Sequence, residues 1–289
     1  MEMVLGYFLV LTGLAGSGLA GYFDLKTTEI PDEIPLAMVV LGVLTRFGYS
    51  LFTGDWSFFL LPAIIGGGFF GFGFLMYYSG QWGGGDAKIL GAIGILMGTL
   101  PQGIAASSVF PLFMNLIVNV FLVGAAYIII YGIIMAARDT RIKDHFLKSL
   151  KGSVNEFIIF FVLILAVVGV NTYVFWANFG VLNLWLIGGT AAGVTGFYLL
   201  WKFLKSVERV GFNKKISTKN LREGDMLGED IKKLKLSKKL IRGLTKEEIS
   251  KIRKHKKTIW IREGVRFAPV FPIAVLTTIF FGNLIVLII

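Results

Sequence analysis

Residues 57–88 read SFFLLPAIIGGGFFGFGFLMYYSGQWGGGDAK, and no charged side chain occurs between Asp55 and Asp86. A helix needs about 20 predominantly apolar residues to cross the hydrocarbon core of a bilayer. Residues 57–78 meet this requirement, and a glycine-rich loop with an aspartate follows them. The stretch therefore predicts a membrane-spanning helix that ends close to an ionisable group.

The composition of the whole chain is that of an integral membrane protein. Of its 289 residues, 55% are hydrophobic and 16% are charged, and the mean hydropathy is +0.73. Soluble domains carry about 25% charged residues, and disordered chains are far less apolar. We expect an all-α polytopic membrane protein with about eight transmembrane helices. The stretches that qualify or nearly qualify are 3–23, 34–53, 57–78, 86–104, 108–135, 156–177, 181–201 and 267–289.

The positive charge of the chain is concentrated in one block. Residues 202–266 carry 21 Lys/Arg and 8 Asp/Glu, a net charge of +13, whereas the rest of the chain carries −2. Cytoplasmic loops are enriched in Lys and Arg, so we interpret the block as a cytoplasmic domain and expect no nucleic-acid partner. Its charge favours anionic lipid headgroups. A capping box at Thr245–Glu248 predicts a helix to about Lys256, and 257–262 predicts a strand, which makes the insert a small α+β domain.

Loop charges also predict the orientation of the spans. The 138–151 loop contains five basic residues and should be cytoplasmic. Counting back through the spans places the 24–33 and 79–86 loops on the cytoplasmic face and both termini outside. The first span has no basic region before it, so we expect a mature span and not a cleaved signal peptide.

Two aspartates lie at the predicted cytoplasmic helix ends. Asp24 ends the first apolar run, and Asp86 opens the fourth. Ionisable residues at membrane depth are costly and are functional candidates. Two carboxylates brought together could share one proton, because close like charges cannot both ionise cheaply. One could then act as a general base on water and the other as a general acid on a carbonyl, which is the chemistry of aspartic proteolysis.

Other catalytic chemistries find little support in the sequence. The chain contains no cysteine, which excludes thiol catalysis, disulfides and Cys-ligated zinc. His145 and His255 each lie in a basic loop without a partner at ligand spacing, so we expect no metal and no cofactor.

At these residues the sequence resembles the archaeal type IV prepilin and preflagellin (prearchaellin) peptidases, which are membrane aspartic proteases of the GxGD type. Residues 24–32, DLKTTEIPD, look like the first catalytic segment of the family, and residues 83–88, GGGDAK, fit GxGD followed by x-Lys. The resemblance covers about residues 5–135. Residues 267–272, FAPVFP, are similar to a Pro-Phe-rich segment in the last helix of the family.

The resemblance implies a peptidase that cuts a short basic leader from pilin-like or archaellin precursors at the cytoplasmic membrane boundary. Asp24 and Asp86 would be catalytic, with Gly83, Gly85 and Lys88 in supporting roles. Bacterial relatives also N-methylate their product and often carry a four-cysteine motif. Since this chain has no cysteine, it resembles the peptidase-only branch.

Two alternatives remain open, one of them from a different class of protein. Presenilin-like and signal-peptide-peptidase-like proteases cut within the bilayer, but their aspartates lie on late helices and they carry a Pro-Ala-Leu motif, which is missing here. An ion-coupled transporter would place carboxylates near mid-span, whereas these lie at the boundaries.

Several smaller features have structural interpretations. Asp32 suits the N-cap of the second span, and glycines 83–85 could adopt positive φ beside Asp86. Small-xxx-small spacings predict close helix packing at Gly67/Gly71 and Gly189/Gly193. Asn115 and Asn119, one helical turn apart, predict hydrogen bonds between helices.

The expected organisation follows from these assignments. It comprises a catalytic transmembrane core at 1–135, a basic cytoplasmic loop at 136–155, a transmembrane hairpin at 156–201, a basic cytoplasmic domain at 202–266 and a last transmembrane helix at 267–289.

Overall fold

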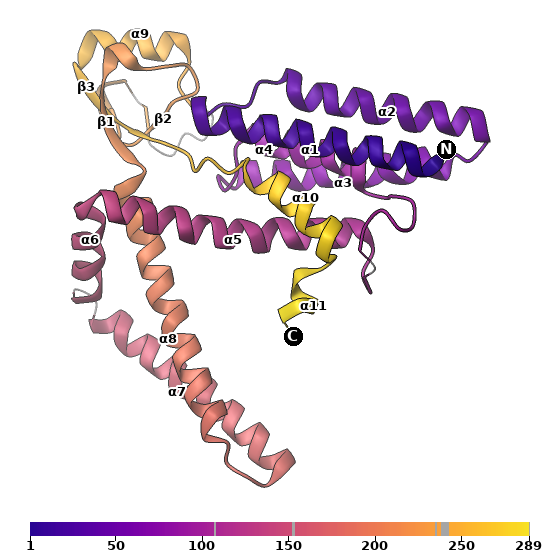
Figure 1. Cartoon of the computed structure of the whole chain (residues 1–289). Helices are drawn as coiled ribbons and strands as arrows, with labels where there is room; N and C mark the ends of the chain where they lie inside the picture. The colour runs from indigo at the N-terminus through magenta and orange to yellow at the C-terminus, as the bar shows by residue number, and fades with distance from the viewer. Residues whose placement is uncertain (107, 152–153, 235, 238–242, 289) are drawn as a thin grey trace. The chain divides into compact units, whose positions relative to one another are not determined.

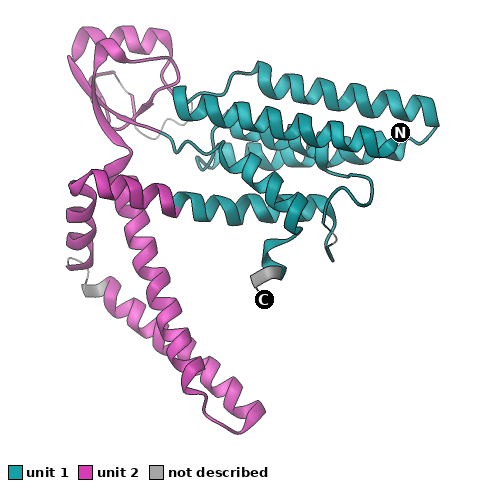
Figure 2. Ribbon diagram, viewed as in Figure 1, with its two compact units in different colours: residues 1–128, 264–289 teal, residues 129–263 magenta. Residues whose placement is uncertain are grey.

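A computed structural model describes the chain except residues 107, 152–153, 235, 238–242 and 289 (Figure 1). The described chain divides into two compact units (Figure 2). Unit 1 comprises residues 1–128 and 264–289, and unit 2 comprises residues 129–263.

The all-α polytopic fold expected from the sequence is confirmed. Within the described residues, six helices are long and apolar enough to cross a membrane. They are α1 (Glu2–Thr27), α2 (Glu33–Thr53), α3 (Ser57–Tyr78), α5 (Leu112–Arg138), α7 (Val154–Phe179) and α8 (Leu184–Ser206).

Two of the eight expected spans are shorter than predicted. The fourth is α4 (Gly84–Met97), whose 14 residues extend about 21 Å against a core of about 30 Å. Pro101 follows shortly, and proline disfavours helical backbone at the residue before it. The last expected span is α10 (Val270–Phe281) and α11 (Leu284–Ile288). Gly282, at φ 69°, breaks it because left-handed backbone cannot continue a helix.

The short helix α4 is the buried centre of unit 1. It packs against α1, α2 and α3, and its apolar side chains from Ala87 to Met97 are almost all buried. Glycine allows close approach of the helices: a Cβ atom on Gly73 of α3 would lie 2.7 Å from Cα of Ala87. The packing predicted for Gly67/Gly71 and Gly189/Gly193 is not found, because a Cβ atom at any of these four glycines would meet nothing within 4 Å in the part of the chain that the structure describes. The glycines that contact α4 lie on another face of α3.

A buried arginine closes the C-terminal end of α4. Arg46 of α2 is 1% exposed. Its guanidinium donates to the carbonyl oxygens of Ile95, Leu96 and Thr99 at 2.8, 2.9 and 2.7 Å, and to that of Phe58 at 3.0 Å. The last carbonyls of a helix have no partner within the helix. Arg46 therefore takes the place of water at the end of a helix that stops inside the protein.

A polar network joins α5 to the break between α10 and α11. Asn119 donates to the Thr278 hydroxyl at 2.8 Å and to the Gly282 carbonyl at 2.6 Å, and Asn283 donates to Asn115 at 3.0 Å. The prediction that Asn115 and Asn119 make interhelical hydrogen bonds is confirmed. These bonds satisfy backbone groups that the break at Gly282 leaves without helical partners.

Unit 2 contains the α7–α8 hairpin, the short helix α6 (Thr140–Lys151) and a small α+β domain. The domain begins after the π turn η1 (Val207–Gly211). Its antiparallel sheet has the order β1 (Asn213–Ser217), β3 (Thr258–Arg262), β2 (Met226–Leu227). Helix α9 (Lys246–His255) packs its buried Ile249 and Ile252 into the same apolar core as Ile259 and Ile261 of β3. The 3-10 turns η2 (Thr218–Asn220) and η3 (Lys232–Leu234) complete it.

Local sequence signals in this domain predicted its elements well. Thr245 accepts a hydrogen bond from the backbone N–H of Glu248, and the Glu248 carboxylate accepts one from Thr245 N–H. The predicted capping box is thus confirmed, as is the strand at Thr258–Arg262.

Candidate active site

Asp24 lies in the last turns of α1, where its side chain is 7% exposed. Its Oδ2 atom accepts a hydrogen bond from the backbone N–H of Ala268 at 2.9 Å. Arg266 lies within electrostatic range of Asp24, and its guanidinium donates to the Leu25 carbonyl at 2.8 Å. Helix α1 ends at Thr27, and the next residue, Thr28, has a left-handed backbone (φ 62°) and donates its N–H to the Asp24 carbonyl.

Asp86 lies in the first turn of α4 and is 6% exposed. Its Oδ2 atom accepts a hydrogen bond from the backbone N–H of Gly83 at 2.9 Å, which caps the helix. Its Oδ1 atom is buried and has no hydrogen-bond partner among the described residues. Since buried polar atoms are nearly always paired, an unpartnered carboxylate oxygen is a candidate for a functional role.

The fold brings the two aspartates within electrostatic range of each other. Helices α1 and α4 pack against each other, and Asp24 acts electrostatically on Asp86. Two carboxylates in one buried site favour a single shared proton, because two negative charges at close range in a low dielectric are costly. Such a pair can activate a water molecule and protonate a carbonyl without a metal ion.

The glycines expected to support the dyad have a backbone geometry that differs from the prediction. The prediction that glycines 83–85 adopt positive φ is wrong, because none of them does, and Gly83 has φ −76°. Gly80 has the left-handed backbone instead, at φ 73°. Gly85 is needed for close approach, because a Cβ atom there would lie 2.9 Å from Cδ1 of Ile30. Ile30, in the loop after α1, therefore packs directly against Gly85 at the start of α4.

Lys88 and Asp32 form an ion pair between the same two segments. Lys88 Nζ lies 2.6 Å from Asp32 Oδ1, and the side chains are 37% and 74% exposed. Asp32 occupies the N-cap position of α2, but its side chain makes no capping bond. The predicted capping role is thus wrong, and the carboxylate pairs with Lys88 instead.

The contacts of the C-terminal segment with Asp24 and Trp82 could hardly be predicted from the sequence. Ala268 and Arg266 reach Asp24, and the ring of Trp82, which precedes the glycine loop, lies 5.4 Å from that of Phe267. The resemblance of 267–272 to a last-helix segment was the one signal available, and it carried no information about contacts.

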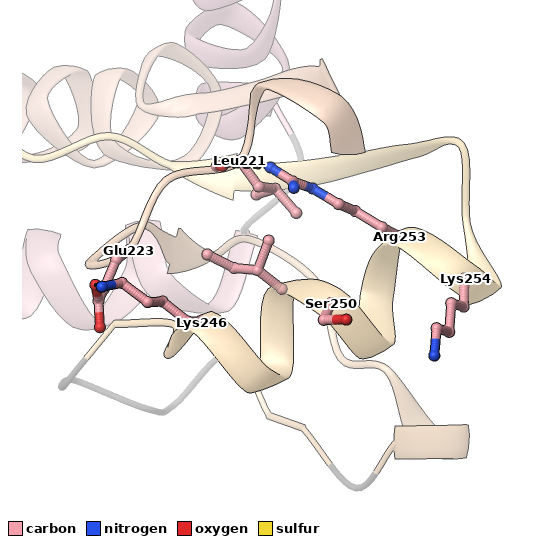
Figure 3. A pocket seen from close by; sticks show the side chains of 7 residues that line it. Leu221, Glu223, Lys246, Ser250, Arg253 and Lys254 are labelled. Carbon is pink, nitrogen blue, oxygen red and sulfur yellow. Dashed lines mark hydrogen bonds and ion pairs between the residues drawn. The ribbon is translucent and has the colours of Figure 1, made fainter.

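A shallow hollow in unit 2 is a weaker candidate (Figure 3). Three of its charged groups are already engaged: Lys246 pairs with Glu223 at 3.5 Å, and Arg253 donates to the Thr218 and Leu221 carbonyls. It lacks the pair of buried carboxylates found in unit 1.

Comparison with known proteins bears on the same part of the chain. Residues 11–133 match the type IV leader peptidase family. This range contains both Asp24 and Asp86, and it confirms the resemblance drawn from the two aspartate motifs. No solved structure gives a significant match.

Two curated relatives agree with the family match. The prepilin peptidase EppA of Methanothermobacter thermautotrophicus is 24% identical over 159 residues, which cover 52% of this chain and 41% of the relative. The preflagellin peptidase of Methanocaldococcus jannaschii is 33% identical over 90 residues, which cover 30% of this chain and 37% of the relative. The chain thus spans less than half the length of either relative.

Proposed function

We propose that this protein is a membrane aspartic endopeptidase that removes the short basic leader of pilin-like or archaellin precursors. The observation that carries the proposal is the pair of buried carboxylates that α1 and α4 bring within electrostatic range, inside the leader peptidase segment. The names of the two relatives support the substrate class.

The reaction follows from a dyad that holds one proton. The ionised aspartate takes a proton from water, whose oxygen attacks the scissile carbonyl carbon, while the protonated aspartate gives its proton to the carbonyl oxygen. The resulting gem-diol collapses when a proton passes to the amide nitrogen and the C–N bond breaks. The unpartnered Oδ1 of Asp86 is the atom best suited to hold the shared proton.

The location of the dyad fits a cut at the membrane boundary. Asp24 and Asp86 lie near helix ends, next to the loops at 24–33 and 79–86. We place this face in the cytoplasm, with both termini outside, because the basic residues of 138–151 and 202–266 favour the cytoplasmic side. A substrate could then keep its basic leader in the cytoplasm and its apolar helix in the bilayer. The block at 202–266 would contact anionic lipid headgroups.

The test is cleavage of a precursor by the full-length protein in liposomes, with products identified by mass. Asp24→Asn and Asp86→Asn should each lower the cleavage rate at least about 100-fold, the usual contribution of general acid–base catalysis. Asp55→Asn is the matched control, because Asp55 is an exposed aspartate in the loop before α3. Each variant must show the same thermal unfolding as the parent protein.

The outcomes separate the alternatives. Substantial activity in either variant of the dyad would refute the mechanism, and inactivation by a chelator would indicate a metal. Cleavage inside the apolar helix of the substrate would favour a presenilin-like protease, and no cleavage of any precursor would leave the transporter as the better explanation.

A further inference from the structure

The segment Arg266–Phe271 lies far from the dyad in sequence and outside the family match at 11–133. In unit 1 it lies beside α1 and enters α10 (Figure 1). Ala268, Val270 and Phe271 are fully buried.

The segment contacts α1 at the position of the first aspartate. Ala268 N–H donates to Asp24, and Arg266 donates to the carbonyl of the next residue, Leu25. One turn earlier, a Cβ atom on Gly21 would lie 3.1 Å from Cα of Pro269, so the two backbones approach at a glycine. These are contacts of backbone and polar atoms at defined positions, which fix orientation more tightly than apolar packing alone.

The same segment contacts the loop that carries the second aspartate. The Trp82 ring lies 5.4 Å from that of Phe267 and 6.1 Å, edge to face, from that of Phe271. Helix α5 holds the segment from another direction, because the Tyr127 hydroxyl donates to the Arg266 carbonyl at 2.7 Å. A Cβ atom on Gly124 would lie 2.8 Å from the Phe267 ring.

We propose that Arg266–Phe271 is a third part of the active site, in which the backbone N–H of Ala268 positions the Asp24 carboxylate relative to Asp86. The proposal rests on the proposed function for its catalytic consequence, but the hydrogen bond itself can be tested without any activity. Ala268 is a positioning residue, since it acts through Asp24. Catalytic groups must be held within fractions of an ångström by neighbours that are themselves fixed.

The chemistry of the donor makes the proposal specific. A backbone N–H cannot swing away as a side chain can, and the surrounding contacts to Pro269, Phe267 and Arg266 fix the peptide that carries it. It therefore restricts which way the Asp24 carboxylate faces. If the segment only filled space in the apolar core, its side chains would matter for activity, but the N–H group of Ala268 would not.

The experiment separates these two roles with a pair of substitutions at one position. Ala268→Pro removes the N–H, and Ala268→Gly removes the buried methyl but keeps the N–H. In the precursor cleavage assay, we expect Ala268→Pro to lower kcat at least tenfold with KM within twofold. We expect Ala268→Gly to stay within threefold of the parent protein. An equal or larger loss in Ala268→Gly would overturn the proposal in favour of packing.

A second measurement does not depend on catalysis. Thermal unfolding of the parent protein, Ala268→Pro, Asp24→Ala and the double variant forms a double-mutant cycle. If the N–H acts on Asp24, the shift in the unfolding midpoint caused by Ala268→Pro should fall by at least half in the Asp24→Ala background. Additive shifts would overturn the proposal. If the parent protein fails to cleave any precursor but the cycle is non-additive, the proposed function falls and the positioning of Asp24 stands.

Discussion

The backbone N–H of Ala268 lies 2.9 Å from Oδ2 of Asp24, although 244 positions separate the two residues in the chain. The C-terminal segment thus contacts the first aspartate, while α4 carries the second on its first turn. The candidate site therefore depends on segments that are far apart in the sequence and are held together by the packing of unit 1. We expect substitutions that disturb this packing to change the geometry of the site.

Gly73→Ala should destabilise the protein by about 1–3 kcal/mol, the usual cost of overpacking. The added methyl group would lie 2.7 Å from the backbone of Ala87, next to Asp86, so α3 or α4 must move. Gly71→Ala is the control on the same helix, because its methyl group meets nothing within 4 Å. Unfolding in mixed micelles gives both values, and equal effects of the two substitutions would contradict the packing described.

Arg46→Met should lower stability by more than about 2 kcal/mol, because an unsatisfied buried acceptor costs about 1–3 kcal/mol. The carbonyls of Ile95, Leu96 and Thr99 would lose their donor. The stability of Arg46→Lys should lie between that of the parent protein and that of Arg46→Met, because the lysine ammonium group keeps some of the hydrogen-bond donors. The same unfolding assay gives the order, and a fully stable Arg46→Met variant would show that α4 needs no such cap.

The Asp139–Arg141 pair should produce a small pH dependence of stability. The hydrogen bond from the Arg141 guanidinium, at 2.7 Å, holds the pKa of Asp139 below its usual value. A carboxyl whose pKa is lower in the folded than in the unfolded protein stabilises the fold above the unfolded pKa. That contribution is lost as the pH falls through the folded pKa. Asp139→Asn should thus cost less than about 1 kcal/mol at neutral pH.

The check on this pair is a comparison of unfolding midpoints across pH. The difference between Asp139→Asn and the parent protein should shrink as the medium is acidified. A difference that stays constant would mean that the substitution acts through something other than the carboxylate charge.

The proposed orientation can be tested with introduced thiols, because the chain contains no cysteine. Glu29→Cys and Gln81→Cys should react with an impermeant maleimide only in inverted vesicles, whereas Asp55→Cys should react in intact cells. All three residues are exposed. Labelling of positions 29 and 81 from opposite sides would refute a shared face for the two loops.

Local and short-range features could be predicted from the sequence, because they depend on neighbouring residues. The lengths of the apolar runs predicted the long helices, and the capping box of Thr245 and Glu248 predicted the start of α9. The two aspartate motifs indicated the peptidase family, since the types and order of residues are read directly from the chain.

Features that depend on distant partners could not be predicted. Asp32 had the right residue type for a cap, yet Lys88, 56 positions away, pairs with it. Glycine spacing indicated close packing on α3 but not the face, because the face depends on where α4 lies. Helix α4 is also shorter than its apolar run suggested, and its end is closed by Arg46 of another helix.

The sequence by itself therefore determined that the chain is a polytopic membrane protein, and it identified Asp24 and Asp86 as its unusual groups. Apolar length and residue type are sufficient for both conclusions. Only the tertiary structure decided that the two carboxylates lie within electrostatic range, that Asp86 Oδ1 is buried without a partner among the described residues, and that Ala268 donates to Asp24. The physical reason is that burial and hydrogen bonding between distant segments arise from packing, which no local pattern encodes.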